Sequence, residues 1–206
     1  PLVALGLGLY AVASLGSEPF LARLSFPVTL AGGVLLLSGT AIARQALPGV
    51  AYLAFMMPLP YVALKGLTAT ATLFDARVTA AMLPWLGVPV HRRGTLLYLA
   101  NMTLEVADAC SSIPAIASLL ALGAAYGFVR RRSVGVTLLL LVAAIPLGVT
   151  ANIVRIVLTA AGVHYLGPIA IHNAIHTWHG TSVFLVTFAA LALVDAGIER
   201  LRRGRR

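Results

Sequence analysis

Long stretches without Asp, Glu, Lys or Arg constrain the fold of this chain more than any other feature. A helix needs about 20 residues to cross the apolar core of a membrane. One stretch, Ile156 to Val194, is too long for one crossing and is interrupted by glycines, Pro168 and four histidines, so we place its span at Thr177 to Val194. The other five spans are Pro1 to Ser17, Leu24 to Ala43, Gln45 to Leu64, Ala109 to Val129 and Ser133 to Val154.

The scarcity of charge supports this interpretation, since only 10% of the 206 residues are charged and 60% are hydrophobic. A soluble domain carries about 25% charged residues and needs them to face water. We therefore predict an all-α integral membrane protein, a polytopic bundle of about six transmembrane helices. The chain begins at Pro1 without Met, so we expect a few residues to precede it, and we interpret the first apolar run as a retained span.

Arginines near the span ends predict the orientation, because Lys and Arg gather on the cytoplasmic side of membrane proteins. The clusters Arg130 to Arg132 and Arg200 to Arg206 are placed in the cytoplasm, and the two spans between them fit that parity. Counting back along the chain puts both termini in the cytoplasm and the start of the fourth span, with Cys110, at the outer surface. Arg92 and Arg93 then lie outside, against the rule. We predict a multi-pass protein of the cell's inner (cytoplasmic) membrane.

The whole chain, 1–206, is predicted to form a single membrane domain in four parts. Residues 1–64 are three N-terminal spans, 65–109 an outer interfacial loop, 110–196 a three-span core, and 197–206 a basic cytoplasmic tail. Within the loop, Thr68 to Leu86 mixes charged and apolar residues as an interfacial helix does. Two β-prone segments follow, Gly87 to Gly94 and Thr95 to Val106, and they predict a hairpin-like structure.

Charge and cysteine content exclude several functions. The net charge of +9 could indicate nucleic-acid binding, but the basic residues are dispersed among apolar runs, so lipid is the expected partner. A single cysteine excludes an intramolecular disulfide and a thiolate metal cluster. His172, His176 and His179 are closely spaced and raise the question of zinc, but no HExxH-type carboxylate motif accompanies them. We predict no metal and no cofactor.

Three polar residues, widely separated in sequence, are placed at the same membrane face by this topology. Cys110 begins the fourth span, Arg155 ends the fifth, and His176 begins the last. Each also has a structural interpretation: a lone Cys is often an apolar filler, an Arg can extend to lipid headgroups, and a His can be an interfacial polar residue.

Their chemistry gives the three residues a joint interpretation. The thiolate of a cysteine is the nucleophile, and a nearby guanidinium and a helix N-terminus both favour the thiolate. A histidine can protonate an amine leaving group near neutral pH. Arg155 could instead stabilise an oxyanion, and the sequence does not decide between these roles.

Four segments carry a resemblance to a known family. Leu104 to Ile113 resembles an "EV…ACSG" segment, Asn152 to Ile156 an "N…R(I/V)" segment, and His176 to Gly180 with Phe184 an "H…G…F" segment. Gly87-Val-Pro-Val with Gly94 resembles the outer loop before the cysteine. In order and spacing, residues 58–184 resemble the exosortase/archaeosortase family. The departures are Ser112, where the family usually has Gly, and His179, a second candidate histidine. His176 is preferred because its four-residue offset to Gly180 matches the family pattern.

The resemblance implies a cysteine protease or transpeptidase. Its substrates would be proteins with a C-terminal sorting signal: a short motif such as Pro-Glu-Pro, a transmembrane helix and a basic cluster. Cys110 would form a thioester at the outer surface, transfer to an amine or another acceptor would follow, and Arg155 and His176 would be its essential partners.

Several neighbouring polar residues have two interpretations each. Glu105, Asp108 and Asn152 would either hydrogen-bond within loops, or pair with Arg155 and orient His176. Arg92 and Arg93 would meet either an acidic residue of the sorting signal or lipid headgroups.

Two other classes of function remain open. One is a small polytopic transporter, in which Arg155 and the histidines line a polar path. The other is a non-catalytic membrane assembly subunit. The clustering of the three residues at one surface argues against the transporter. The sequence does not identify the sorting motif, the acceptor or the oligomeric state.

Overall fold

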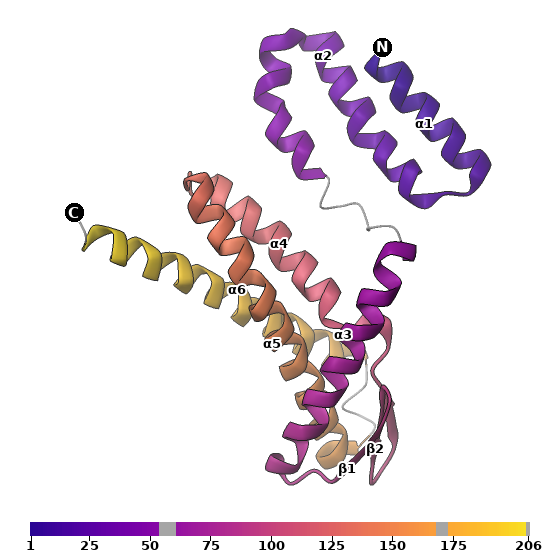
Figure 1. Ribbon diagram of the computed structural model, residues 1–206, viewed down its shortest axis with the longest axis vertical. Coiled ribbons are helices and arrows are strands. Elements are labelled where there is room, and N and C mark those ends of the chain that lie inside the picture. Colours follow the sequence, from indigo (N-terminus) through magenta and orange to yellow (C-terminus); the bar gives the residue numbers. More distant parts are fainter. Residues whose placement is uncertain (54–60, 168–172, 205–206) are drawn as a thin grey trace. The chain divides into compact units, whose positions relative to one another are not determined.

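The computed structural model describes residues 1–53, 61–167 and 173–204; the side chains of 61–63, 109 and 173–179 are not described. The chain forms two compact units, Pro1–Lys65 and Gly66–Arg206, each of which is described by itself (Figure 1). Among the described residues, four helices are long and apolar enough to cross a membrane: Pro19–Tyr52, Ser112–Val129, Val134–Leu166 and Gly180–Arg203. The predicted all-α, polytopic membrane fold is thus confirmed, while the count of six spans stays a prediction.

The first unit consists of α1 (Leu2–Gly16) and α2 (Pro19–Tyr52), which lie close together. Glycines allow this approach: a Cβ on Gly6 would lie 2.2 Å from Oγ1 of Thr29, and one on Gly32 would lie 2.6 Å from the backbone N of Val3. Small residues at helix contacts are typical of membrane proteins, since they let two backbones pack closely. The unit is therefore held by packing between helices.

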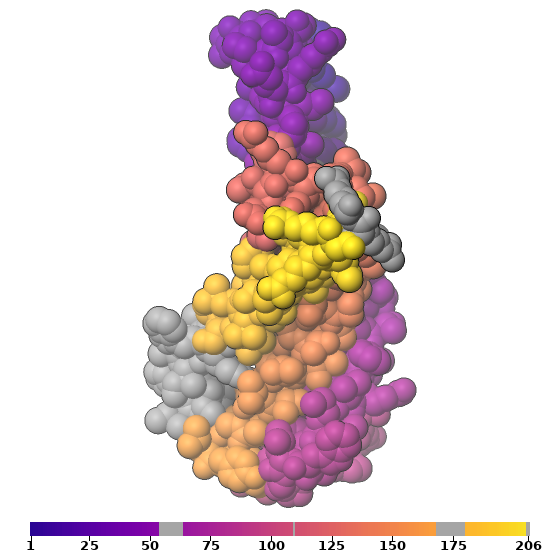
Figure 2. All heavy atoms as spheres, turned by 90° about the vertical axis from the view of Figure 1, so that its left-hand side faces the viewer, coloured from indigo at the N-terminus to yellow at the C-terminus, as the bar shows by residue number. Residues whose placement is uncertain are grey.

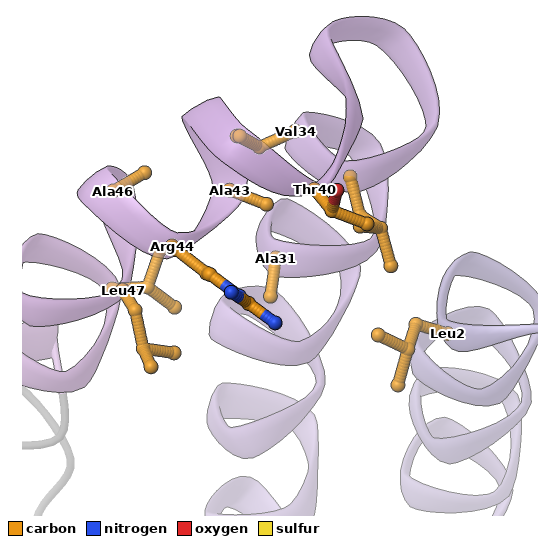
Figure 3. A pocket seen from close by; sticks show the side chains of 10 residues that line it. Leu2, Ala31, Val34, Thr40, Ala43, Arg44, Ala46 and Leu47 are labelled. Atoms are coloured by element: carbon orange, nitrogen blue, oxygen red, sulfur yellow. The ribbon is translucent and has the colours of Figure 1, made fainter.

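Helix α2 is sharply kinked at Gly39, whose φ of 75° and ψ of 176° are open to glycine alone. Its second part folds back beside the first, and the two enclose a cavity of about 250 Å³ with Leu2 of α1 (Figure 3). Arg44 extends into this cavity. The predicted break between the second and third spans thus lies at Gly39, a little before the expected position at Arg44. Residues 54–60 of the predicted third span lie outside the described residues.

The second unit begins with α3 (Tyr61–Met82), whose first residues belong to the first unit, and continues with a short 3₁₀ helix, η2 (Leu83–Leu86). A three-stranded antiparallel sheet follows, formed by β1 (Val90–Arg93), β2 (Leu96–Leu99) and β3 (Thr103–Glu105). A second 3₁₀ turn, η3 (Asp108–Cys110), leads into α4 (Ser112–Val129). The last two helices are α5 (Val134–Leu166) and α6 (Asn173–Arg203).

The secondary structure predicted for residues 65–109 is partly correct. Residues 68–86 are helical as predicted, but the hairpin-like segment is a three-stranded meander in which β2 pairs with both β1 and β3. The segment Thr95 to Val106 contains two strands because the chain turns between Leu99 and Met102, whose N–H and carbonyl groups are joined by a 3.0 Å hydrogen bond. A position of α3 in the membrane interface stays a prediction.

Helices α4, α5 and α6 form a bundle around Leu119, Leu140, Ala144 and Leu191. Helix α6, in yellow, lies against α5, in orange (Figure 2). Helices α4 and α5 approach closely at Gly148, where an added Cβ would lie 2.8 Å from Cγ1 of Ile116. Such contacts hold the N-terminus of α4 firmly against α5.

An ionic cluster ties α6 to the turn between α4 and α5. Arg132 contacts Asp195 and Glu199, each at 2.6 Å, and the hydroxyl of Tyr126 donates to Asp195 at 2.9 Å. Helix α6 continues to Arg203, so the segment 197–203, predicted as part of a basic tail, is the end of a helix. The reason is that Glu199 joins the cluster and holds this last part of α6 against the bundle.

The second half of α5 packs against a different set of elements. Ile153, Val157, Ala160 and Val163 meet Leu83 and residues of the sheet in one apolar core, and Ile156 meets Ala76, Leu97 and Val106 in another. At 1.5 Å per residue, the 33 residues of α5 span about 50 Å, well beyond an apolar core of about 30 Å. The predicted span Ser133 to Val154 is the first part of this helix, which packs against α4 and α6. Arg155 lies where this part ends and the part that packs against α3, η2 and the sheet begins.

Candidate active site

Cys110 ends the turn η3 and lies just before α4. Its N–H donates to the carbonyl of Ala107 at 2.8 Å, and the N–H of Ser111 donates to the carbonyl of Asp108 at 3.2 Å. Ser111 is extended, and its side chain makes no capping hydrogen bond to the start of α4. The thiol is free and half-buried. The cysteine therefore sits on a short ordered turn at a helix N-terminus, where the dipole favours negative charge.

The start of α4 is capped by a residue from another helix. Oδ2 of Asp75, on α3, accepts a 2.8 Å hydrogen bond from the N–H of Ser112. The same oxygen accepts from Nδ2 of Asn152 on α5 at 2.9 Å. Burial raises the pKa of Asp75 above its ordinary value, and the hydrogen bonds from Ser112 and Asn152, with the charge of Arg155, oppose that rise. One carboxylate thus joins α3, α4 and α5.

Asn152 and Arg155 converge on the backbone carbonyl of Cys110. Nδ2 of Asn152 donates to this oxygen at 2.8 Å, and Nη2 of Arg155 lies 3.4 Å from it, at the long limit of a hydrogen bond. The two side chains are three positions apart on α5 and so share a face. The structure therefore brings Cys110 and Arg155 together, although 45 positions separate them.

Two cavities meet at Arg155. One, of about 180 Å³, lies between the sheet and α5, and Cys110, Glu105 and Arg155 line it together with Leu97, Leu104, Val106, Ile156 and Thr159. The other, of about 170 Å³, lies between α4, α5 and α6, and its lining includes Ser111, Asn152, Arg155, Gly180 and Phe184. The side chain of Arg155 thus borders both cavities, and Cys110 lines the first of them.

The predicted histidines can be placed only by their helix. His176 and His179 lie in the first turns of α6, but their side chains are outside the described residues, as is all of His172. Gly180 follows directly, and a Cβ at that position would lie 3.8 Å from Cδ of Arg155. The backbone at this point of α6 therefore lies beside Arg155. Among the residues whose placement is described, no group of His, Cys, Asp and Glu is arranged to hold a metal ion.

The remaining predicted residues fall into two groups. Glu105, at the end of β3, lines the cavity of Cys110, and Oδ1 of Asp108 lies 3.4 Å from the hydroxyl of Thr72. Arg92 and Arg93 lie on β1, and Arg92 donates to the carbonyl of Gly94 at 2.7 Å. Neither arginine is among the described residues that line the two cavities. That Arg92 and Arg93 contact the substrate stays a prediction.

The comparison with known proteins decides the family. A family model described as transmembrane exosortase matches residues 1–193. The chain belongs to the transmembrane exosortase family. No curated protein and no solved structure matches it. The predicted resemblance is confirmed, and the match extends over the first two spans, where the sequence carries no recognisable motif. With its apolar helices, this exosortase is a multi-pass membrane protein.

Asp75 is the residue of this exosortase site that sequence reasoning missed. Asp75 and Arg77 both indicated an interfacial helix, yet Asp75 is fully buried and Arg77 is exposed. Thr72, Asp75, Ala76 and Thr79 are all buried, at the i, i+3, i+4 and i+7 spacing of one helix face. That spacing of small and polar residues on one helix face could have indicated that Asp75 is buried, because such a face packs against polar groups of the protein.

The arrangement can support attack by the thiol on a carbonyl carbon. A guanidinium close to a thiol favours the thiolate, and its several N–H donors can also reach an oxyanion. Much of the cavity wall at Cys110 is apolar, from Leu97, Leu104, Val106 and Ile156. Apolar walls exclude water and strengthen the electrostatic effect of Arg155.

Proposed function

We propose that this exosortase is a membrane cysteine protease and transpeptidase. It would cleave proteins that carry a C-terminal sorting signal, at the outer face of the inner membrane, through a thioester on Cys110. The observation that carries the proposal is the shared cavity of Cys110 and Arg155, in a chain of the exosortase family. The orientation, with both termini in the cytoplasm, rests on the arginine clusters at 130–132 and 200–206.

In the first step, the thiolate of Cys110 attacks the carbonyl carbon of the scissile peptide bond. A carbon–sulfur bond forms, and the carbonyl oxygen carries the negative charge, which Arg155 stabilises; the cavity that Arg155 shares with Cys110 supports this role. Collapse of this intermediate breaks the carbon–nitrogen bond, and His176 protonates the leaving amine. In the second step an acceptor amine, another nucleophile or water attacks the thioester and passes its proton to His176, which the first step left neutral. The carbon–sulfur bond breaks, and the sulfur leaves as thiolate.

An apolar groove supports the idea of a membrane-embedded substrate. A hollow of about 470 Å³ lies between α5 and α6, lined by residues that include Leu147, Val154, Leu158 and Val186. It shares Ala151 and Val183 with the cavity that contains Ser111 and Arg155. A transmembrane helix of the substrate that diffuses along the bilayer could lie in this groove with its cleavage site near Arg155.

The direct test of this function is capture of the thioester. The full chain in lipid vesicles is mixed with a model substrate containing a Pro-Glu-Pro motif, a transmembrane helix and a basic cluster, then quenched in acid. We expect an adduct on the peptide containing Cys110, with the mass of the N-terminal product, that neutral hydroxylamine releases. Cleavage with no adduct in rapid-quench samples would contradict the covalent mechanism. Binding of substrate without cleavage would favour a non-catalytic assembly subunit.

The choice of histidine is tested by a matched pair, because His176 and His179 lie within one turn of each other on α6. His176→Ala is expected to lower the rate of processing by about 10²-fold or more, the usual contribution of a general acid. His179→Ala is expected to retain processing within about 5-fold, since that histidine has no proposed proton-transfer role. Cleavage of the model substrate is measured for both variants at equal amounts of folded protein. The reverse order of effects would assign the role to His179.

A further inference from the structure

Asp75 is an acidic residue with no access to solvent, and the proposed chemistry does not use it. Its relative exposure is 0%, and that of Asn152 is 2%. Asp75 belongs to α3, while its two hydrogen-bond donors belong to α4 and α5. A buried carboxylate is costly unless it is hydrogen-bonded, so its presence here calls for a reason.

The hydrogen bonds form a chain from Asp75 to the cysteine. Nδ2 of Asn152 donates both to Oδ2 of Asp75 and to the carbonyl oxygen of Cys110. Both partners are acceptors, so only the NH₂ end of the amide can face them, and Asp75 thereby fixes the orientation of Asn152. Through the N–H of Ser112, Asp75 also fixes the first residue of α4. The backbone is thus held on both sides of Ser111, at the carbonyl of Cys110 and at the N–H of Ser112.

We propose that Asp75 is a positioning residue of this exosortase site, which holds the backbone of Cys110 beside Arg155 through Asn152 and Ser112. It acts as a hydrogen-bond acceptor from the N–H of Ser112 and from Nδ2 of Asn152. The effect of Asp75 on substrate processing rests on the proposed function, whereas its effect on the reactivity of Cys110 toward a maleimide does not.

Two substitutions separate hydrogen bonding from charge. Asp75→Asn loses the charge but keeps an oxygen that can accept from Ser112 and Asn152. Asp75→Leu has a similar size but accepts from neither, and leaves two buried N–H groups unsatisfied. The control is Thr79→Val, on the same buried face of α3, because among the described residues the Thr79 hydroxyl has no hydrogen-bond partner.

The first readout is alkylation of Cys110 by a maleimide, which reports on this residue alone because the chain has one cysteine. Its rate is measured at one neutral pH for the full chain in vesicles. Among the described residues, the charged groups on the elements packed around Cys110 are Asp75 on α3, Glu105 on β3, Asp108 on η3 and Arg155 on α5. For Asp75→Leu we expect slower alkylation than in the wild type, because Cys110 moves away from Arg155, whose charge favours the reactive thiolate.

For Asp75→Asn we expect the alkylation rate to stay the same or to increase, since a negative charge near Arg155 is removed while the hydrogen bonds to Ser112 and Asn152 remain. A purely electrostatic role of Asp75 would make alkylation faster in both variants. That result, or an unchanged rate in Asp75→Leu, would overturn the proposal whether or not the protein cleaves any substrate. Thr79→Val is expected to match the wild type.

The second readout is the split between kcat and KM for the model substrate. We expect Asp75→Leu to lower kcat about 10²-fold with KM within about 3-fold, and Asp75→Asn to stay within about 5-fold of wild type. Asn152→Leu, which breaks the same link from α5, gives the same test if Asp75→Leu does not fold. The kcat of the double variant Asp75→Leu/Asn152→Leu should be no lower than that of the more affected single variant. Additive losses would contradict a single chain of contacts.

Discussion

Cys110→Ala is expected to reduce processing of a sorting-signal substrate by about 10⁴-fold or more, the scale of losses when a nucleophile is removed. No other thiol can replace it, because Cys110 is the sole cysteine of the chain. The measurement is cleavage of the model substrate in membrane vesicles, followed by mass spectrometry of both products.

Cys110→Ser sharpens this prediction. A serine hydroxyl is far less acidic than a thiol, and Arg155 favours an anion but cannot accept a proton. We therefore expect Cys110→Ser to be inactive as well. The fold should tolerate both changes, since Cys110 is half-buried and its contacts to Asn152 and Arg155 use the backbone carbonyl. Undiminished processing by a folded Cys110→Ala would refute the nucleophile.

The sequence predicted the membrane fold because apolar length is a local property. The intervals between charged residues marked α4, and the first part of α5, close to where the structure has them. The end of α5 could not be predicted in the same way. Residues beyond Arg155 remain helical because α3 and the sheet cover them, and such coverage depends on contacts distant in sequence.

In the candidate site, too, the residues with a local sequence signal could be predicted, and the residue that depends on distant contacts could not. Cys110 and Arg155 could be predicted because a thiol at a span start and an arginine at a span end stand out in apolar surroundings. Asp75 could not, because its role depends on Ser112 and Asn152, 37 and 77 positions away. The arginine Arg77 nearby made the helix look amphipathic. A carboxylate that caps another helix leaves no trace in its own segment beyond the spacing of its buried neighbours.

Arg155→Ala is expected to lower processing by about 10³-fold, since one side chain both favours the thiolate and stabilises the oxyanion. Its position supports both roles, because Arg155 lines the cavity of Cys110 as well as the cavity beside α6. Alkylation of Cys110 by a maleimide should also be slower in this variant, because the nearby positive charge that favours the thiolate is lost.

Arg155→Lys separates charge from geometry. Lysine keeps the positive charge but lacks the planar set of donors that lets Arg155 serve two partners at once. We expect Arg155→Lys to restore most of the alkylation rate of Cys110 but to leave processing about 10-fold to 10²-fold below the wild type. The matched control is Arg77→Ala on the exposed face of α3, which removes the same charge away from the thiol. Equal losses in Arg77→Ala and Arg155→Ala would show that net charge alone matters, and would remove Arg155 from the active site.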